Sequence, residues 1–332
     1  MSGDAYARAG VSQSAADDAV GALVGALSAG TTGESRQVLA SGHYANVVRI
    51  DERTGIALTT DGVGTKLLVA EQLERWDTVG IDCVAMNVND VICVGARPLA
   101  MVDYLAVDEA DPAVAAEIGK GLAAGAERAG IEIVGGELAQ LGELIRGLDL
   151  AGACFGTVPL DGLVTGSTLE PGDPIIGLPS TGLHSNGYTL ARKALEGIPL
   201  DDDRLGRPLG DALLEPTEIY VKPVVELLDS PIDVRGLAHI TSGGLGNLLR
   251  LEAEVGYEIG SPLPVPPIFE LIRERAAVPD DEMHDVFNMG TGFCVVVAAS
   301  DEDDALGLLR RHYADAARIG TVTPDAGSVT RA

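Results

Sequence analysis

Residues 56–67 read Ile-Ala-Leu-Thr-Thr-Asp-Gly-Val-Gly-Thr-Lys-Leu. The apolar start predicts a strand over 56–60 that ends at Asp61 in a glycine-spaced turn. In layered folds of sheets and helices, ligand sites gather at the carboxyl ends of strands. A glycine-rich turn that ends in lysine favours phosphate, because backbone N–H groups and an ammonium can both approach the anion. We therefore expect Lys66 to contact a phosphorylated ligand at this turn.

This turn is not a P-loop. That motif needs two glycines separated by four residues, then Lys, then a Ser or Thr that reaches the metal. Here Gly62 and Gly64 are one residue apart, and Leu67 follows Lys66. Asp61 is the nearest group able to hold a metal, because hard divalent cations take carboxylate oxygens and leave room for substrate phosphates.

Outward from the turn, helices and strands alternate through the first half of the chain. Apolar residues repeat at three and four positions over 77–95, which predicts a buried helix that Asp82, Asn89 and Asp90 interrupt. Asp111-Pro112 predicts the start of a second helix, which ends at Gly130. Further elements are predicted as a helix at 15–27 and strands at 99–107, 131–134 and 148–158.

A glycine- and proline-rich run at 159–174 indicates a linker. We therefore predict an N-terminal domain, 1–160, and a C-terminal domain, 161–332, because the chain is longer than one core usually supports. In the second half we expect a strand at 175–178, a helix that ends at 195, and helices at 216–228 and 245–251. A last strand, helix and strand are expected from 293. The irregular alternation predicts an α+β fold with mixed sheets flanked by helices, not a doubly wound parallel sheet.

The charge of the chain excludes two classes of partner. It has 50 acidic and 23 basic residues, a net charge of −27 and a pI near 4.3. Nucleic acids and anionic membranes bind basic surfaces and would be repelled. Few lysines beside many acids are typical of a halophilic cytoplasm, where salt screens self-repulsion. Most carboxylates are therefore expected in solvent, so acidity alone identifies no site.

The cysteines and the hydropathy predict a soluble, cytoplasmic protein. The four cysteines form no Cys-x-x-Cys pair and are expected to be buried free thiols in a reducing compartment. No apolar run reaches the ~18 residues of a membrane span. No basic segment followed by an apolar run opens the chain.

Three acids stand in apolar or glycine-rich surroundings: Asp61, Asp90 and Glu137. A carboxylate there is costly unless a cation or a proton neutralises it. Each residue taken singly could be a helix cap or an ordinary exposed acid, but the three together favour a shared Mg²⁺. Lys66 could likewise be a surface lysine, but we interpret it as a phosphate contact because the chain keeps only four lysines.

His184-Ser-Asn-Gly187 lies where a helix is predicted to begin, so N–H groups, a hydroxyl and an amide converge on an anion-sized spot. Ser185 or Asn186 could instead only cap the helix. Capping does not require His184, which we interpret as a substrate or catalytic residue. Residues 241–244, Thr-Ser-Gly-Gly, are either a second anion-binding turn or an ordinary tight turn. The neighbouring His239 is interpreted as a core histidine.

These motifs occur in the order and spacing of one known family, and the chain resembles the phosphoribosylformylglycinamidine cyclo-ligases, also called aminoimidazole ribonucleotide synthetases. The resemblance covers nearly the whole chain. Selenophosphate synthetase and thiamine-monophosphate kinase share the two-domain architecture and the aspartates, but not these motifs. The motifs that carry the resemblance are Asp61-Gly-Val-Gly-Thr-Lys66, Asn87-Val-Asn-Asp90 with Gly95-Ala-Arg-Pro98, Gly135-Gly-Glu137, His184-Ser-Asn-Gly187 and Phe287-Asn-Met-Gly290.

The resemblance implies an α+β fold whose N-terminal sheets pair across a homodimer, with ATP and Mg²⁺ between the domains. It implies a ring closure in purine synthesis: ATP phosphorylates the formyl oxygen of formylglycinamidine ribonucleotide, an amidine-side nitrogen attacks that carbon, and phosphate leaves. The implied roles are metal binding by Asp61, Asp90 and Glu137; nucleotide binding by Asp61, Gly62, Gly64, Thr65, Lys66 and Asn89; substrate binding by His184, Ser185, Asn186 and Gly187; and catalysis by Lys66, Asp90 and His184.

Three places depart from the family pattern. Residues 41–46, Ser-Gly-His-Tyr-Ala-Asn, replace an early loop rich in Gly and Phe, Gln140 replaces a carboxylate, and Ser242 replaces a glycine. Two other functions stay open. One is a different ATP-dependent phosphoryl transferase such as thiamine-monophosphate kinase, against which residues 184–187 argue. The other is a non-catalytic ligand-binding paralogue, which the changes at His43 and Gln140 would fit.

Overall fold

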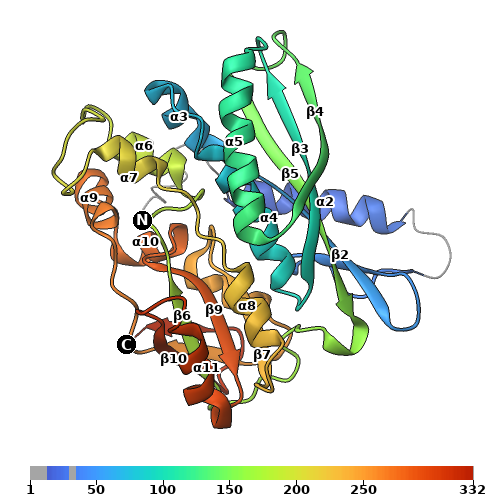
Figure 1. The fold of residues 1–332 in the computed structure, drawn as a ribbon. Coiled ribbons are helices and arrows are strands. Elements are labelled where there is room, and N and C mark those ends of the chain that lie inside the picture. Colours follow the sequence, from blue (N-terminus) through green and yellow to red (C-terminus); the bar gives the residue numbers. More distant parts are fainter. Residues whose placement is uncertain (1–12, 30–34, 332) are drawn as a thin grey trace.

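Two mixed β-sheets, one in each half of the chain, organise the computed structural model, which describes residues 13–29 and 35–331 (Figure 1). The predicted α+β fold is confirmed. Sheet A has the strand order β1-β2-β5-β3-β4, and sheet B has the order β11-β8-β10-β6-β9-β7. The last strand of sheet A ends at Pro159 and the first strand of sheet B begins at Pro174.

Sheet A is antiparallel except for its β3–β4 pair, which is parallel and is connected through α5. The predicted capping of α5 is confirmed, because the Asp111 carboxylate accepts hydrogen bonds from two N–H groups and Gly130 ends the helix with φ +72°. The strand predicted at 131–134 continues to Gln140, since it pairs with β3 over its whole length. The strands of sheet A are β1 (Asn46–Arg49), β2 (Thr54–Gly62), β3 (Arg97–Val107), β4 (Glu132–Gln140) and β5 (Leu148–Pro159).

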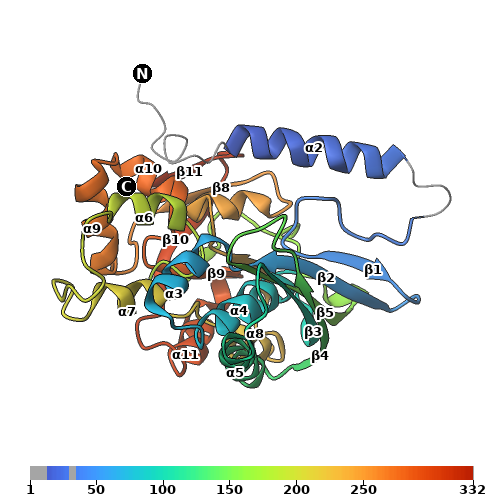
Figure 2. The same ribbon diagram turned by 90° about the horizontal axis from the view of Figure 1, so that it is seen from above.

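Within residues 13–29 and 35–331, helices pack against only one face of sheet A. The helix α4 (Val79–Ile92) lies against β2, β3 and β5, and α5 (Pro112–Ala129) packs on α4 (Figure 2). The two helices approach closely at Gly80, where a Cβ would lie 2.2 Å from the backbone nitrogen of Leu122. Every residue of α4 is buried except Asp90. The opposite face of the sheet leaves Leu58, Val102 and Tyr104 exposed.

Sheet B forms the core of the second half and is antiparallel except for its β11–β8 pair. Its strands are β6 (Pro174–Pro179), β7 (Val234–His239), β8 (Gly256–Ile259), β9 (Thr291–Val297), β10 (Ala317–Thr323) and β11 (Val329–Arg331). The associated α-helices are α6 (Tyr188–Ala194), α7 (Leu209–Leu214), α8 (Val221–Leu228), α9 (Pro267–Ala276), α10 (Asp280–Val286) and α11 (Glu302–Leu309). The short helices are η1 (Gly64–Lys66), η2 (Leu160–Gly162), η3 (Gly244–Arg250) and η4 (Ala299–Asp301).

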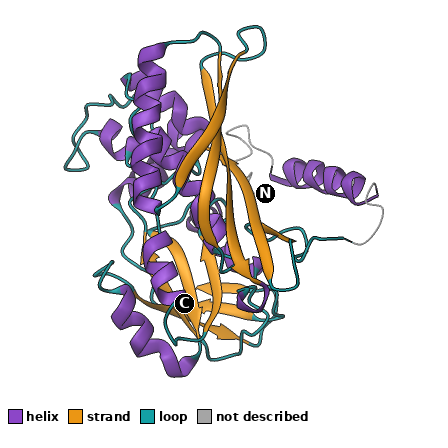
Figure 3. Cartoon of the chain, turned by 45° about the vertical axis from the view of Figure 1, so that its right-hand side comes forward, coloured by secondary structure: helices purple, strands orange, loops and turns teal. Residues whose placement is uncertain are grey.

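Two predicted helices of the second half differ from the structure. The helix expected at 216–228 begins only at Val221, because residues 217–220 run against α4 and bond to it. The helix expected at 245–251 is the 3-10 helix η3. The short helix α3 (Leu67–Leu73) follows the turn after β2, and α2 (Gln13–Ala29) projects away from both sheets (Figure 3).

Two other expectations concern the thiols and the membrane. All four cysteines, Cys83, Cys93, Cys154 and Cys294, are buried and carry free thiols, as predicted. Within residues 13–29 and 35–331, no helix combines the length and the hydropathy that crossing a bilayer requires.

Candidate active site

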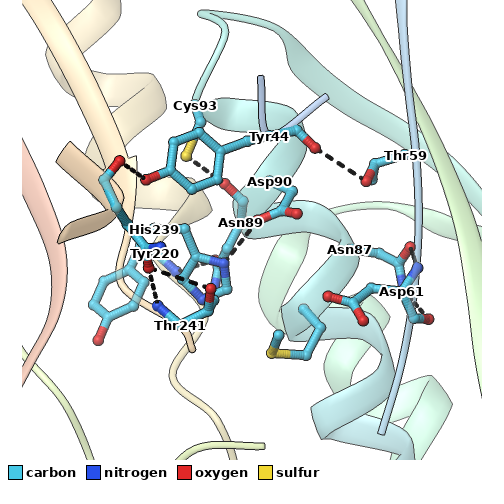
Figure 4. A network of polar contacts seen from close by, with 12 residues as sticks. Tyr44, Thr59, Asp61, Asn87, Asn89, Asp90, Cys93, Tyr220, His239 and Thr241 are labelled. Carbon is cyan, nitrogen blue, oxygen red and sulfur yellow. Dashed lines mark hydrogen bonds and ion pairs between the residues drawn. The ribbon is translucent and has the colours of Figure 1, made fainter. Parts of the chain in front are cut away.

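The candidate site lies where the carboxyl end of β2, the helix α4 and loops of the second half meet (Figure 4). The Asn87 amide holds the end of β2 by two hydrogen bonds to Asp61, one from the Asp61 N–H (3.1 Å) and one to the Asp61 carbonyl (3.1 Å). Asn87 is fully buried. The glycine-spaced turn is therefore fixed to α4 at its first residue.

Asp61 and Asp90 both lie at this junction, and we treat them as a pair because the charge of Asp90 acts on Asp61. Burial, and next the charge of Asp90, raise the pKa of Asp61 to about 6, and a hydrogen bond from the Gly62 N–H (2.7 Å) opposes that shift. Two carboxylates that repel each other in a mostly buried place favour a cation between or beside them. The donor set of Asp61 and Asp90 therefore fits a hard divalent cation that also binds phosphate oxygens.

His239 contacts Asp90. Its Nδ1 lies 2.8 Å from the Asp90 carboxylate, and its Nε2 lies 3.5 Å from the Asn89 amide nitrogen. With Asn89 as donor, Nε2 accepts and Nδ1–H donates to Asp90. The Asn89 side chain also bonds to the Tyr220 N–H (3.0 Å) and to the Glu218 carbonyl (2.8 Å). His239 is a buried histidine, as predicted, but it also orients Asp90, which the sequence did not reveal.

Lys66 does not lie where a phosphate contact was expected. Its side chain is fully buried, and its Nζ lies 2.9 and 2.8 Å from the two carboxylate oxygens of Asp82. The ammonium also donates to the carbonyls of His184 (3.1 Å) and Glu215 (2.7 Å). An ammonium has three donors, so a phosphate contact would require it to leave these acceptors.

Glu137 does not join Asp61 and Asp90, which corrects the predicted three-carboxylate site. Asp61 stands opposite Gly152, which stands opposite Asp103, whereas Glu137 stands opposite Tyr104. These are neighbouring rows of the sheet, and a one-residue offset reverses the face to which a side chain points. Glu137 is therefore exposed on the open face, away from α4. Among the described residues, no three His, Cys, Asp or Glu side chains could share a metal ion.

The segment from His184 to Gly187 lies next to this junction. His184 is buried in a left-handed conformation (φ +61°), and its Nε2 accepts from the Thr181 N–H (3.3 Å). Burial, helped by the charge of Lys66, lowers the pKa of His184 far below its usual value, so the ring is neutral. Its Nδ1 has no hydrogen-bond partner in the described part of the chain.

Neither Ser185 nor Asn186 caps the following helix, whose N-cap is Gly187. The Ser185 hydroxyl lies 3.0 Å from the Thr217 hydroxyl, and the Asn186 carbonyl oxygen accepts from the Ser242 hydroxyl (3.1 Å). The capping alternative is thus wrong for both residues. The contact with Ser242 also brings the two glycine-containing turns of the second half together.

Gly62, Gly64 and Thr65 occupy the connection between β2 and α3. Gly62 is the last residue of β2, and Gly64 has φ +69°, a conformation that favours glycine. The Thr65 hydroxyl lies 3.2 Å from the hydroxyl of Thr189 in α6. This turn therefore contacts the second half at Thr65 as well as at Lys66.

Comparison with known proteins gives the family. The N-terminal and C-terminal domain models of the AIR synthase related proteins match residues 42–158 and 170–331. The phosphoribosylformylglycinamidine cyclo-ligase of Methanothermobacter thermautotrophicus is 54% identical over 88% of this chain and 86% of its own length. The enzyme of the same name from Pyrococcus furiosus is 47% identical over 98% of this chain and 96% of its own length.

The chain belongs to the phosphoribosylformylglycinamidine cyclo-ligase family. A solved structure of AaThiL in complex with AMPPCP and TMP has a similar fold, with a TM-score of 0.63, 19% identity and coverage of 87% of each chain. At this identity the likeness concerns the fold alone.

The departures from the cyclo-ligase family pattern have structural partners. In the early loop, His43 lies 3.2 Å from Glu252, and the Tyr44 hydroxyl donates to the Asn247 carbonyl (2.9 Å). Ser242 supplies the contact to Asn186, while Gly243 and Gly244 keep the positive φ values that the turn needs (+97° and +53°). Gln140 is exposed at the end of β4. It therefore lies on the strand that carries Glu137, outside the Asp61 and Asp90 pair.

Proposed function

We propose that this chain uses ATP to close the imidazole ring of aminoimidazole ribonucleotide from formylglycinamidine ribonucleotide, releasing ADP and phosphate. The observation that carries this proposal is the 54% identity over 88% of the chain to a relative named for this reaction. In this proposal residues 1–160 bind ATP and Mg²⁺, residues 161–332 form the C-terminal α/β domain, and the protein works in the cytoplasm.

Asp61 and Asp90 would hold Mg²⁺ against the nucleotide phosphates. Mg²⁺ in such sites commonly takes one or two carboxylates and completes its coordination with phosphate and water oxygens. When bound, Mg²⁺ would neutralise charge on the transferred phosphoryl group. The backbone at Gly62, Gly64 and Thr65 lies at the same end of β2 and would contact the nucleotide. The Asn89 side chain is fully buried and bonded to Glu218, Tyr220 and His239, so a nucleotide contact would require it to leave these partners.

Phosphorylation solves the chemical difficulty of the ring closure, because an amide oxygen is a poor leaving group and phosphate is a good one. The formyl oxygen attacks the terminal phosphorus of ATP and ADP leaves. The amidine-side nitrogen then forms a bond to the formyl carbon, and the C–O bond breaks with its electron pair on phosphate. The neutral His184 ring, Ser185, Asn186 and the backbone at Gly187 would orient the ribonucleotide for this attack.

We also propose that the chain forms a homodimer through the open face of sheet A. Leu58, Val102 and Tyr104 are 46%, 42% and 43% exposed on that face, which no helix of the described residues covers. Monomeric proteins rarely leave a contiguous apolar patch of this kind in water. A second copy of the same sheet would bury it.

The test compares the wild type with Asp90→Asn in high potassium chloride, with ATP, Mg²⁺ and formylglycinamidine ribonucleotide. We expect the wild type to form aminoimidazole ribonucleotide and ADP in equal amounts. Asp90→Asn should be roughly 10²- to 10³-fold slower, as for the loss of one electrostatic stabiliser. Asp201→Asn, a change at an exposed carboxylate, is the matched control and should keep full activity.

Two other results would replace this function with one of its alternatives. Phosphorylation of thiamine monophosphate without a ring product would assign a kinase. Binding of ATP and the ribonucleotide with no turnover by folded wild type would assign a non-catalytic paralogue.

A further inference from the structure

Lys66 and Asp82 form a fully buried ion pair outside the Asp61 and Asp90 pair. Both side chains have no exposed surface. The Lys66 ammonium donates to the Asp82 carboxylate and to the carbonyls of His184 and Glu215, so its three donors all have protein acceptors. A buried lysine whose donors all have protein acceptors stabilises the fold and is not free to bind an anion.

The ion pair joins the two halves of the chain. Lys66 and Asp82 belong to η1 and α4 of the first half, whereas the groups that they bond belong to loops of the second half. One Asp82 oxygen accepts from both the N–H and the hydroxyl of Thr217, each at 2.7 Å. With its proton on Asp82, the Thr217 hydroxyl accepts from Ser185 at 3.0 Å. The network thus runs from Lys66 to two consecutive residues of the proposed substrate segment, His184 and Ser185.

The backbone at His184 needs such support. Its φ of +61° is a left-handed conformation that costs energy for a residue other than glycine. The Lys66 ammonium binds the carbonyl of this same residue at 3.1 Å. The Thr65–Thr189 contact attaches the start of α6, just beyond Gly187, to the same short helix η1. The first half therefore holds this segment directly at His184 and Thr189, and indirectly at Ser185, because Thr217 bonds both Ser185 and Asp82.

We propose that Lys66 and Asp82 are positioning residues that form a buried latch, which holds residues 184–186 in the conformation that binds the ribonucleotide. Lys66 does not contact the nucleotide phosphates. The identity of the ligand rests on the proposed function, but the latch itself does not. Because η1 follows directly from the Asp61 turn, the latch also fixes the substrate segment relative to the proposed nucleotide site.

The test uses two variants that avoid an unpaired buried charge, since removal of one partner alone would unfold many proteins. Lys66→Met with Asp82→Asn is neutral and keeps an oxygen for the Thr217 N–H. Thr217→Val removes only the hydroxyl that connects Asp82 with Ser185. The control is Arg75→Met, which breaks an exposed ion pair with Asp211 between the same two halves.

Hydrogen exchange measured by mass spectrometry reports the latch without any assay of activity. We expect amides of residues 183–187 to exchange at least about tenfold faster in the double variant and about threefold faster in Thr217→Val, consistent with the loss of charged and of neutral hydrogen bonds. In both latch variants, amide exchange in β9 should match the wild type. In Arg75→Met, exchange at residues 183–187 should also match the wild type. Unchanged exchange at 183–187 in the folded variants would overturn the proposal, and Thr217→Val decides alone if the double variant does not fold.

Binding and kinetics separate a latch from a phosphate contact. In the double variant, KM for the ribonucleotide should rise at least about tenfold, while the Kd of AMPPCP with Mg²⁺ stays within about twofold. A Kd for AMPPCP weakened tenfold or more, with exchange unchanged, would make Lys66 a nucleotide ligand instead. If the wild type forms no ring product, the proposed function fails, and the exchange and AMPPCP results still decide the latch.

Discussion

Asp61 carries a charge that the folded chain disfavours in the absence of a cation. Its pKa of about 6, against an ordinary 3.8, means that the folded state holds this proton to higher pH than the unfolded state. Ionised Asp61 therefore destabilises the protein, and its unfavourable effect appears as the pH rises from about 4 to about 7. In the proposed function, bound Mg²⁺ would offset this electrostatic cost.

Asp61→Asn should consequently stabilise the metal-free protein by about 1–3 kcal/mol at pH 7–8, since one pKa unit corresponds to about 1.4 kcal/mol. The Asn oxygen can still accept from the Gly62 N–H, so the change removes mainly the charge. Urea unfolding of both proteins from pH 4 to pH 8 measures this. The free energies of unfolding of the two proteins should converge toward pH 4. An Asp61→Asn protein less stable than the wild type at pH 8 would show that the Asp61 charge does not destabilise the folded state.

The sequence identified several residues of the candidate site but not the residues that they contact. It singled out Asp61, Asp90 and His184, which the structure gathers around one junction of the two halves. It also singled out Lys66, but the partner that uses its charge, Asp82, lies in a helix where a buried acid cannot be told from an exposed one. The prediction that Glu137 shares a metal with Asp61 and Asp90 was wrong, because the face to which a strand residue points depends on strand register. One sequence does not specify that register.

Among the elements, α4 supplies Asp82, Asn89 and Asp90, whose side chains bond to the second half. It was predicted well, because a long apolar stripe with a period of three to four is the strongest local signal. The short strands β1, β8 and β11 were not predicted, since strands of three or four residues leave little pattern. The late start of α8 was also missed. Its cause is tertiary: the polar groups of Asp82 and Asn89 bind residues 217–220 in an extended conformation.

The open face of sheet A can be tested as a dimer interface. If it is the dimer interface, Val102→Asp places an unpaired charge in the buried contact, and this is costly enough to separate the subunits. Light scattering coupled to size exclusion should show a dimer for the wild type and a folded monomer for Val102→Asp.

Val265→Asp provides the matched control, because Val265 is a similarly exposed apolar residue in the second half, 44% accessible. It should remain dimeric. A wild type that is monomeric over the whole concentration range, or a Val102→Asp protein that stays dimeric, would exclude this interface.

Across the whole molecule, the two halves meet at buried polar pairs. Asp82 with Thr217, Asn89 with Tyr220 and Asp90 with His239 connect residues that are 135, 131 and 149 positions apart. Such pairs specify one relative placement of the halves more strictly than apolar contact alone. They also explain why sequence patterns predicted strands in both halves but not the junction between the halves. The formal net charge of −27 belongs to the whole chain, and added salt screens the repulsion among these charges.

In the proposed function, phosphorylation of the formyl oxygen precedes ring closure. The most direct test supplies the wild type with formylglycinamidine ribonucleotide labelled with ¹⁸O at the formyl oxygen, together with unlabelled ATP in unlabelled water. Each aminoimidazole ribonucleotide formed should then be matched by one phosphate that carries the label. Unlabelled phosphate, or ATP turnover without the ring product, would contradict it.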